Sequence, residues 1–181
     1  MNSAIRLDLI LQEAVATPYR DLVTRQTGAA VRNRLLRVLR DHPGHDAHLD
    51  FSEVGLVDFS CADEVVAKLI VASAELPVPR VLLHGLGADH AEAIEHALAR
   101  LGLVVVAVLV DSDQPLLLGA VPDDCRTAFG ALTPRGRVAA AAIALALGWS
   151  EARAREALEG LATRRCVLAH PDATFEFGAV A

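Results

Sequence analysis

Apolar and polar positions change their spacing several times along the chain, and each change marks an expected element. In residues 27–44, apolar side chains recur every three to four positions until Pro43 and Gly44 end the pattern, which predicts an amphipathic helix with an arginine-rich polar face. Residues 47–51 alternate apolar and polar side chains, as expected of a short strand. Residues 4–16 alternate well enough for a strand or hairpin, but their apolar run can equally begin a helix.

The middle of the chain repeats this alternation of strand and helix. A second helical stretch is predicted through Ser73, and Asp89 is a good N-cap for a further helix. Strands are predicted on either side of that helix, at 80–84 and in the valine-rich run 103–110. The alternating order, with short connections, predicts an α/β domain in which helices pack on a mixed sheet and which ends near residue 120.

The C-terminal part of the chain has a different order of elements. Residues 111–132 are rich in Asp, Gly and Pro, which indicates a linker that can hold one short strand or helix. Helices are predicted at 137–147 and, capped by Ser150, at 151–162, and a strand–turn–strand signal surrounds 170–172. The order of helix, turn, helix and hairpin resembles that of small winged-helix domains. The expected domains are therefore residues 1–120 and residues 121–181.

Composition and charge exclude several classes of protein. Hydrophobic residues make up 53% of the 181-residue chain, far more than in chains that stay disordered. The net charge is −6 and aromatic residues are only 4%, so neither the basic surface of a non-specific nucleic-acid binder nor a set of stacking platforms for single strands is expected. Acidic residues outnumber basic ones before residue 131 but not after it, so any DNA contact is expected in the C-terminal part.

Candidate metal ligands and catalytic groups are sparse. Cys61, Cys125 and Cys166 are odd in number and lack metal-ligand spacing, and no signal peptide opens the sequence, so we expect a cytoplasmic protein. The histidines within residues 42–48 belong to a turn that leads into a strand, where exposed histidines are commoner than metal ligands. We therefore expect no metal and no cofactor, and no acid–base or nucleophile–base motif favours an enzyme.

The most informative stretch is residues 49–69, in which a short apolar piece ends at Asp58 and Ser60 follows where a helix is expected to begin. A hydroxyl at a helix N-terminus can cap free backbone N–H groups, and the partial positive charge there would stabilise a phosphate attached to it. Ser60 can therefore be a phosphorylation switch. The alternative is that Ser60 is only an N-cap, with Glu64 completing a local hydrogen-bond pattern.

This stretch resembles a known family. A strand followed by DFS, then by V-D-x-S and a helix, is similar to the STAS domain of anti-sigma-factor antagonists, and DFSCADEV is most similar to STAS-like domains of bacterial proteins without assigned function. The resemblance covers about residues 4–120 and implies that a serine just after an acid is phosphorylated by a kinase of the GHKL ATPase type, which abolishes partner binding. Ser60 matches that serine and Asp58 the acid. Where the antagonists have a glycine after the serine, this chain has Cys61.

Five further polar residues are expected to help bind a partner. Thr24 or Thr27 can cap the helix that follows them, and Arg25 between them can meet an anion. Asp63 and Glu64 place negative charge beside the Ser60 hydroxyl.

We expect a non-enzymatic bacterial signalling protein whose STAS-like domain binds a protein partner, such as a GHKL-type ATPase, and whose C-terminal domain transmits the result. The alternative is a winged-helix transcription regulator that binds DNA, with the STAS-like domain serving for homodimerisation or ligand sensing. Glu151 and Glu156 on the second helix oppose this alternative, and no membrane association is expected. The arginines placed to meet DNA are Arg153, Arg155, Arg164 and Arg165.

Overall fold

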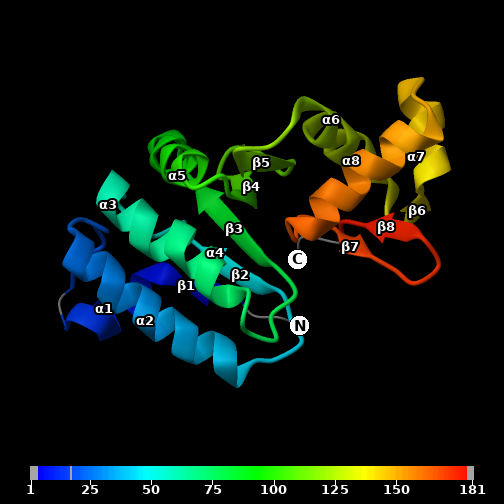
Figure 1. The fold of residues 1–181 in the computed structure, drawn as a ribbon. Coiled ribbons are helices and arrows are strands. Elements are labelled where there is room, and N and C mark those ends of the chain that lie inside the picture. Colours follow the sequence, from blue (N-terminus) through cyan, green and yellow to red (C-terminus); the bar gives the residue numbers. More distant parts are fainter. Residues whose placement is uncertain (1–3, 17, 179–181) are drawn as a thin grey trace. The chain divides into compact units, whose positions relative to one another are not determined.

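The computed structural model describes residues 4–16 and 18–178, which belong to two compact units (Figure 1). Unit 1 is Met1–Ala120 and unit 2 is Val121–Ala181. Each unit has helices and a sheet of its own. Among these described residues, no helix is long and apolar enough to cross a lipid bilayer.

Unit 1 is built on a mixed five-stranded sheet, which confirms the predicted α/β class. Strands β1 to β4 are parallel and lie in the order in which the chain visits them, and β5 pairs antiparallel with β4. Because parallel crossovers share one handedness and the strand order never reverses, the connecting helices gather on one face (Figure 1). The elements are β1 (Ile5–Arg6), α1 (Leu7–Val15), α2 (Arg25–Asp41), β2 (Ala47–Asp50), α3 (Phe59–Ala62), a π-helix η1 (Asp63–Ala67), α4 (Lys68–Ser73), β3 (Val81–Leu86), α5 (Ala88–Arg100), β4 (Val104–Leu109) and β5 (Pro115–Gly119).

The core of unit 1 lies between the sheet and these helices. Alternate strand residues point to opposite faces, so Leu49 and Leu83 pack in the core. Val31 and Leu35 of α2 meet them with no exposed surface, at the helical spacing that the sequence predicts. His48 and His84 stand on the opposite face of the sheet.

The starts of the helices in unit 1 differ in part from the predicted ones. Thr24 caps α2, as expected, and its side chain accepts a hydrogen bond from the backbone N of Thr27 at 3.3 Å. Asp89 is not an N-cap: the N-cap of α5 is Gly87, two residues earlier, and Asp89 lies in the first turn, where a negative charge is also favourable. Residues 4–16 form a very short strand and then a helix, because only Ile5 and Arg6 find a partner strand.

Two elements occur where a linker was expected. Residues 111–132 contain strand β5 and helix α6 (Asp123–Leu132), so the expectation of a linker is wrong there. Pro122 directly before α6, and Asp123 and Asp124 in its first turn, are residues that favour a helix start.

Unit 2 is a small α/β unit with a three-stranded antiparallel sheet in the order β6-β8-β7. The predicted helix at 137–147 begins later, at Ala140, because Val138 and Ala139 pair with β8. Ser150 caps the next helix as predicted, accepting a hydrogen bond from the backbone N of Arg153 at 3.3 Å. The elements after α6 are a 3₁₀-helix η2 (Thr133–Arg135), β6 (Val138–Ala139), α7 (Ala140–Leu147), α8 (Glu151–Thr163), β7 (Leu168–Ala169) and β8 (Thr174–Glu176).

The histidine pair on the sheet face opposite the helices makes the stability of the fold sensitive to acid. Nδ1 of His48 lies 2.8 Å from Nε2 of His84, and the rings stack with centroids 5.0 Å apart. Burial lowers the pKa of both imidazoles, and each histidine of the pair is therefore neutral in the folded state at neutral pH. Protonation is easier in the unfolded chain, so the stability of the fold is lost as pH falls below about 6.5.

We therefore expect the free energy of unfolding to fall by about 1 kcal/mol between neutral pH and about pH 5. In His84→Gln this dependence should be weaker, because one of the two groups is removed while a polar neighbour for His48 is kept. The exposed His45 is the matched control, and His45→Gln should keep the wild-type dependence. Urea unfolding at a series of pH values measures how the free energy of unfolding depends on pH. If this dependence is the same in the wild type and in His84→Gln, the histidine pair is not its source.

Candidate functional site

The Asp58 carboxylate holds together the loop before α3 and the start of α2. Its Oδ1 accepts hydrogen bonds from the backbone N of Cys61 at 2.7 Å and from the hydroxyl of Ser60 at 2.8 Å. Its Oδ2 accepts one from the backbone N of Thr24 at 3.1 Å. Burial raises the pKa of Asp58, but these hydrogen bonds outweigh burial, so the pKa lies below its usual value and the group is ionised.

Ser60 does not occupy the position that the sequence predicts for it. The N-cap of α3 is Asp58, and Ser60 lies inside the first turn, half-buried, with its hydroxyl donating to that carboxylate. The expectation of Ser60 as an N-cap is therefore wrong, because a stronger acceptor two residues earlier already binds the free backbone N–H group. The Glu64 carboxylate accepts hydrogen bonds from Arg25, Arg32 and Lys68.

Asp63 and Glu64 begin the π-helix η1 and are almost fully buried, with side chains 1% and 4% exposed. A π-helical turn is rare and occurs mostly at functional positions. Here all five residues of the turn are buried. Gly28 of α2 permits this packing, since a Cβ on Gly28 would lie 2.9 Å from the Cβ of Glu64 and 3.1 Å from the Cα of Cys61.

Four cations surround the two buried carboxylates, and we call these six residues the basic cluster. Arg25 donates to both carboxylates at 2.8 Å, and Arg100 donates to Asp63 at 2.9 Å. Glu64 also accepts from Arg32 and from Lys68. With four positive charges against two negative ones, the basic cluster carries an excess of positive charge in a chain whose net charge is −6.

The cations keep both carboxylates ionised. Burial raises the pKa of Asp63, but hydrogen bonds from Arg25 and Arg100 outweigh it. Burial likewise raises the pKa of Glu64, and hydrogen bonds from Lys68 and Arg25 outweigh it. The pKa of each carboxyl therefore lies below its usual value.

The basic cluster changes what a partner would meet at the residues predicted from sequence. Asp63 and Glu64 are buried, so a partner does not touch them directly, and the expectation that they face a partner is corrected. The side chains of Arg25, Lys68 and Arg100 are between 42% and 54% exposed and form the accessible surface. Lys68 stands four residues after Glu64, a spacing typical of helical ion pairs. This spacing is the feature of the basic cluster that the sequence around Glu64 itself contains.

We call the Asp58 carboxylate and its three hydrogen-bond donors, Thr24, Ser60 and Cys61, the Asp58 hub. Exposed apolar side chains lie on the segments next to it. Tyr19, Val23 and Leu56 are 66%, 39% and 60% exposed. Tyr19 and Val23 line an apolar hollow of about 370 Å³ together with Leu11, Val15, Asp21, Thr24 and Thr27. A backbone hydrogen bond of 2.7 Å from Leu22 to Leu56 holds this segment beside the loop that carries Asp58. Exposed apolar side chains that gather on one surface are a feature of interaction sites in other proteins.

Phe59, between Asp58 and Ser60, connects the hub to the basic cluster. Its side chain remains partly exposed, with the guanidinium of Arg100 5.6 Å from the ring centroid. His96 meets the same ring edge-on at a centroid distance of 5.0 Å. An aromatic ring next to a cation can contact both apolar and anionic groups of a partner.

Cys61 is a structural thiol. It is fully buried, and its Sγ donates to the backbone oxygen of Thr24 at 3.0 Å. Burial, with the charge of Asp58, raises the pKa of this thiol to about 12, so no thiolate forms at neutral pH.

The arginines expected to meet DNA lie on the flanks of α8 or at its C-terminal end. Arg153 donates to both carboxylate oxygens of Asp124 at 2.8 and 2.7 Å, and Arg155 donates to Glu151 at 2.5 Å. Arg164 donates to the backbone oxygen of Gly160 at 2.9 Å. Arg165 is half-buried with a left-handed backbone. The face of α8 opposite its buried side is formed by Ala152, Glu156, Glu159 and Thr163. Its two acids would repel a phosphate backbone.

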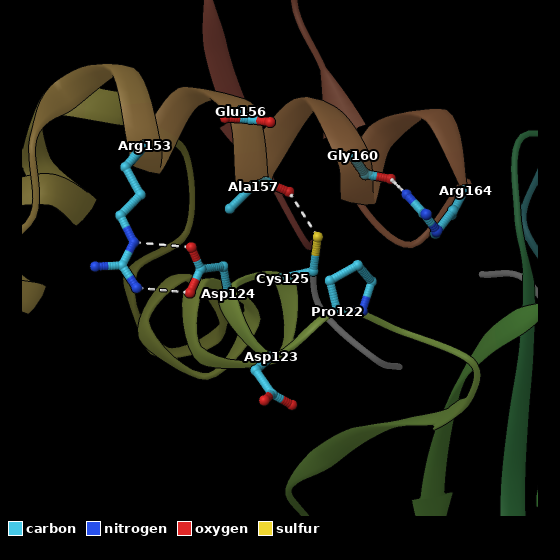
Figure 2. A pocket seen from close by; sticks show the side chains of 9 residues that line it. All are labelled: Pro122, Asp123, Asp124, Cys125, Arg153, Glu156, Ala157, Gly160 and Arg164. Atoms are coloured by element: carbon cyan, nitrogen blue, oxygen red, sulfur yellow. Dashed lines mark hydrogen bonds and ion pairs between the residues drawn. The ribbon is translucent and has the colours of Figure 1, made fainter.

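A groove of about 460 Å³ runs between α6 and α8 in unit 2 (Figure 2). The Arg153–Asp124 ion pair lies at one end. The guanidinium carbon of Arg153 also lies 4.2 Å from the ring centroid of Trp149. Midway along the groove, Cys125 donates from its Sγ to the Ala157 oxygen at 3.4 Å, and Gly160 and Arg164 lie toward the other end (Figure 2). Burial raises the pKa of Cys125, so this thiol stays protonated.

Comparison with known proteins gives no match: no protein-family model, no curated protein and no solved structure corresponds to this chain. Within residues 4–16 and 18–178, no group of three or more His, Cys, Asp or Glu side chains could hold a metal ion.

Proposed function

We propose that the protein is a non-enzymatic signalling protein that binds a protein partner through the surface around Ser60. The observation that carries this proposal is the Asp58 hub, at which one hydroxyl, exposed apolar side chains and the basic cluster meet. Unit 1 serves in this proposal as a STAS-like domain. Unit 2, in which α7, α8 and the pair β7–β8 follow one another, serves in this proposal as the winged-helix-like module that transmits the bound state of unit 1.

Phosphorylation of Ser60 would switch this surface. The Ser60 hydroxyl donates a hydrogen bond to the Asp58 carboxylate. A fully ionised phosphate on Ser60 carries no hydrogen and could not donate this bond. Its charge of about −2 would repel the ionised Asp58 carboxylate. Because the same carboxylate holds the backbone of Thr24, repulsion there would move the Tyr19–Thr24 segment and the apolar hollow that it lines. A single modification would thereby change the docking surface.

The partner is tested with a photo-crosslinking amino acid at Leu56, which is exposed and lies four residues from Ser60. In the native cell we expect one covalent complex, whose yield falls at least fivefold in Ser60→Asp and is unchanged in Ser60→Ala. Ser112→Asp, at a serine between β4 and β5 that is half-buried like Ser60, is the matched control and should keep the yield. The same probe at the exposed Val71 of α4 should give no such complex.

Intact-mass measurement of the protein from the native cell should in addition show a phosphorylated form that Ser60→Ala lacks. If no phosphorylated form occurs and the yield of the Leu56 cross-link is the same in Ser60→Asp as in the wild type, the switch is refuted. If no cross-link forms at Leu56, partner binding at this surface is refuted.

A further inference from the structure

The charge and shape of this surface indicate the chemistry of its partner. We infer that it binds an acidic peptide segment that carries an apolar side chain. The acidic residues would lie on the basic cluster and the apolar residue in the hollow beside Tyr19. This inference rests on the proposed function and deepens it by naming the partner chemistry.

The basic cluster attracts anions because its carboxylates are internal and its cations are external. Asp63 and Glu64 are buried beneath Arg25, Lys68 and Arg100, and their carboxylates are already paired with these cations. About half of each of these three cationic side chains remains exposed to solvent. Their remaining N–H donors can bind carboxylates of a partner without displacing the internal ion pairs.

The cations are also held in position before a partner arrives. Arg25 comes from α2, Lys68 from α4 and Arg100 from α5, and each is anchored on the same π-helical turn. Fixed side chains lose less conformational entropy on binding than free ones. This preorganisation distinguishes the cluster from the other exposed arginine pairs of unit 1, such as Arg34 with Glu13, whose carboxylate is 55% exposed.

The apolar hollow and the basic cluster meet at the start of α2. Thr24 and Thr27 line the hollow, and Arg25 between them belongs to the cluster. A segment of a few residues, at about 3.3 Å per residue when extended, can therefore place one apolar side chain in the hollow and acidic side chains on the cations. Charge complementarity favours an acidic partner over a basic or neutral one, and it sets the register of the segment.

The test uses the full chain and a fluorescein-labelled peptide of sequence EELEELEE, measured by fluorescence anisotropy. We expect binding that weakens with added salt, because the contacts are ionic and exposed. Replacing every glutamate by glutamine, or both leucines by serine, should weaken it at least fivefold. Arg100→Gln should weaken it about three- to fivefold, the effect of one partly exposed charge pair, and Arg100→Lys should restore most of it. Arg34→Gln is the matched control and should change nothing.

Thermal unfolding of each variant confirms that it is folded before its affinity is compared. An oligonucleotide of eight thymidines should bind more weakly than the peptide, since it offers phosphates but no apolar side chain for the hollow. Equal binding of the oligonucleotide, of the glutamine peptide, or of the peptide to Arg100→Gln and to wild type would overturn the inference.

The result separates the inference from the proposed function. If the peptide does not bind while the Leu56 cross-link still depends on Ser60, the acidic-segment inference is wrong and the proposed function stands. If the peptide binds as expected but no cross-link forms, the surface chemistry is supported and the proposed function fails.

Discussion

Glu64→Gln should lower the free energy of unfolding by about 2 to 3 kcal/mol at neutral pH. Glu64 is nearly fully buried and accepts hydrogen bonds from Arg25, Arg32 and Lys68. Glutamine keeps the shape but removes the charge, so these cations lose their shared counterion, and breaking a buried ion pair from one side is strongly destabilising. We place the value below the upper end for fully buried pairs because the cations themselves reach solvent.

The effect of Glu64→Gln should depend on pH in a definite direction. The folded-state pKa of Glu64 is lowered, so its ionised form stabilises the protein above the ordinary value of 4.5, and this contribution is lost as pH falls through the lower folded value. The difference between variant and wild type should therefore shrink in acid. Glu13→Gln, at an exposed glutamate, should cost less than about 0.5 kcal/mol. Urea unfolding measures both, and a difference that grows in acid would contradict this account.

Gly28→Val should destabilise the protein by about 3 kcal/mol. A Cβ at Gly28 would meet the Cβ of Glu64 at 2.9 Å and the backbone of Cys61 at 3.1 Å, and neither can move without shifting the start of α3 and η1. Overpacking of this kind costs about 1 to 3 kcal/mol, and valine adds a second clash through its branched methyl groups. The expected cost lies at the upper end of that range for this reason.

The neighbouring Ala29 provides the control for Gly28→Val. Ala29 also lies on α2 but is half-buried, so Ala29→Val should cost well under 1 kcal/mol, mainly through helix propensity. Chemical denaturation compares the two variants. Equal stabilities would show that α2 and the π-helical turn are not packed as closely as the structure indicates.

The sequence predicts those features of the fold that depend on local signals. Apolar spacing locates α2, and Ser150 marks the start of α8, because both depend on residues within a turn of one another. The π-helical turn at Asp63 has no such local signal. The predicted linker at 111–132 was wrong because Pro122 and the following aspartates suit both a loop and a helix start.

The sequence predicts the Asp58–Ser60 turn of the candidate site but not the charge of the surface around it. The Asp58–Ser60 turn follows from a local motif, whereas the burial of Asp63 and Glu64 depends on cations far away in the chain. Arg25 and Arg32 precede these carboxylates by more than thirty residues, and Arg100 follows them at a similar separation. Without the fold, two adjacent acids beside a serine are naturally interpreted as exposed negative charge. The fold reverses the sign of the surface, since the acids are internal and the cations external.

The central claim is that the Ser60 turn controls the docking of a protein partner. Once the partner cross-linked at Leu56 is identified and purified, isothermal titration of that partner against the full chain tests the claim most directly. We predict that Ser60→Asp raises the dissociation constant at least tenfold, which corresponds to a loss of about 1.4 kcal/mol of binding free energy. Ser60→Ala and Ser112→Asp should leave the dissociation constant unchanged. The same dissociation constant for Ser60→Asp and for the wild type would contradict the claim.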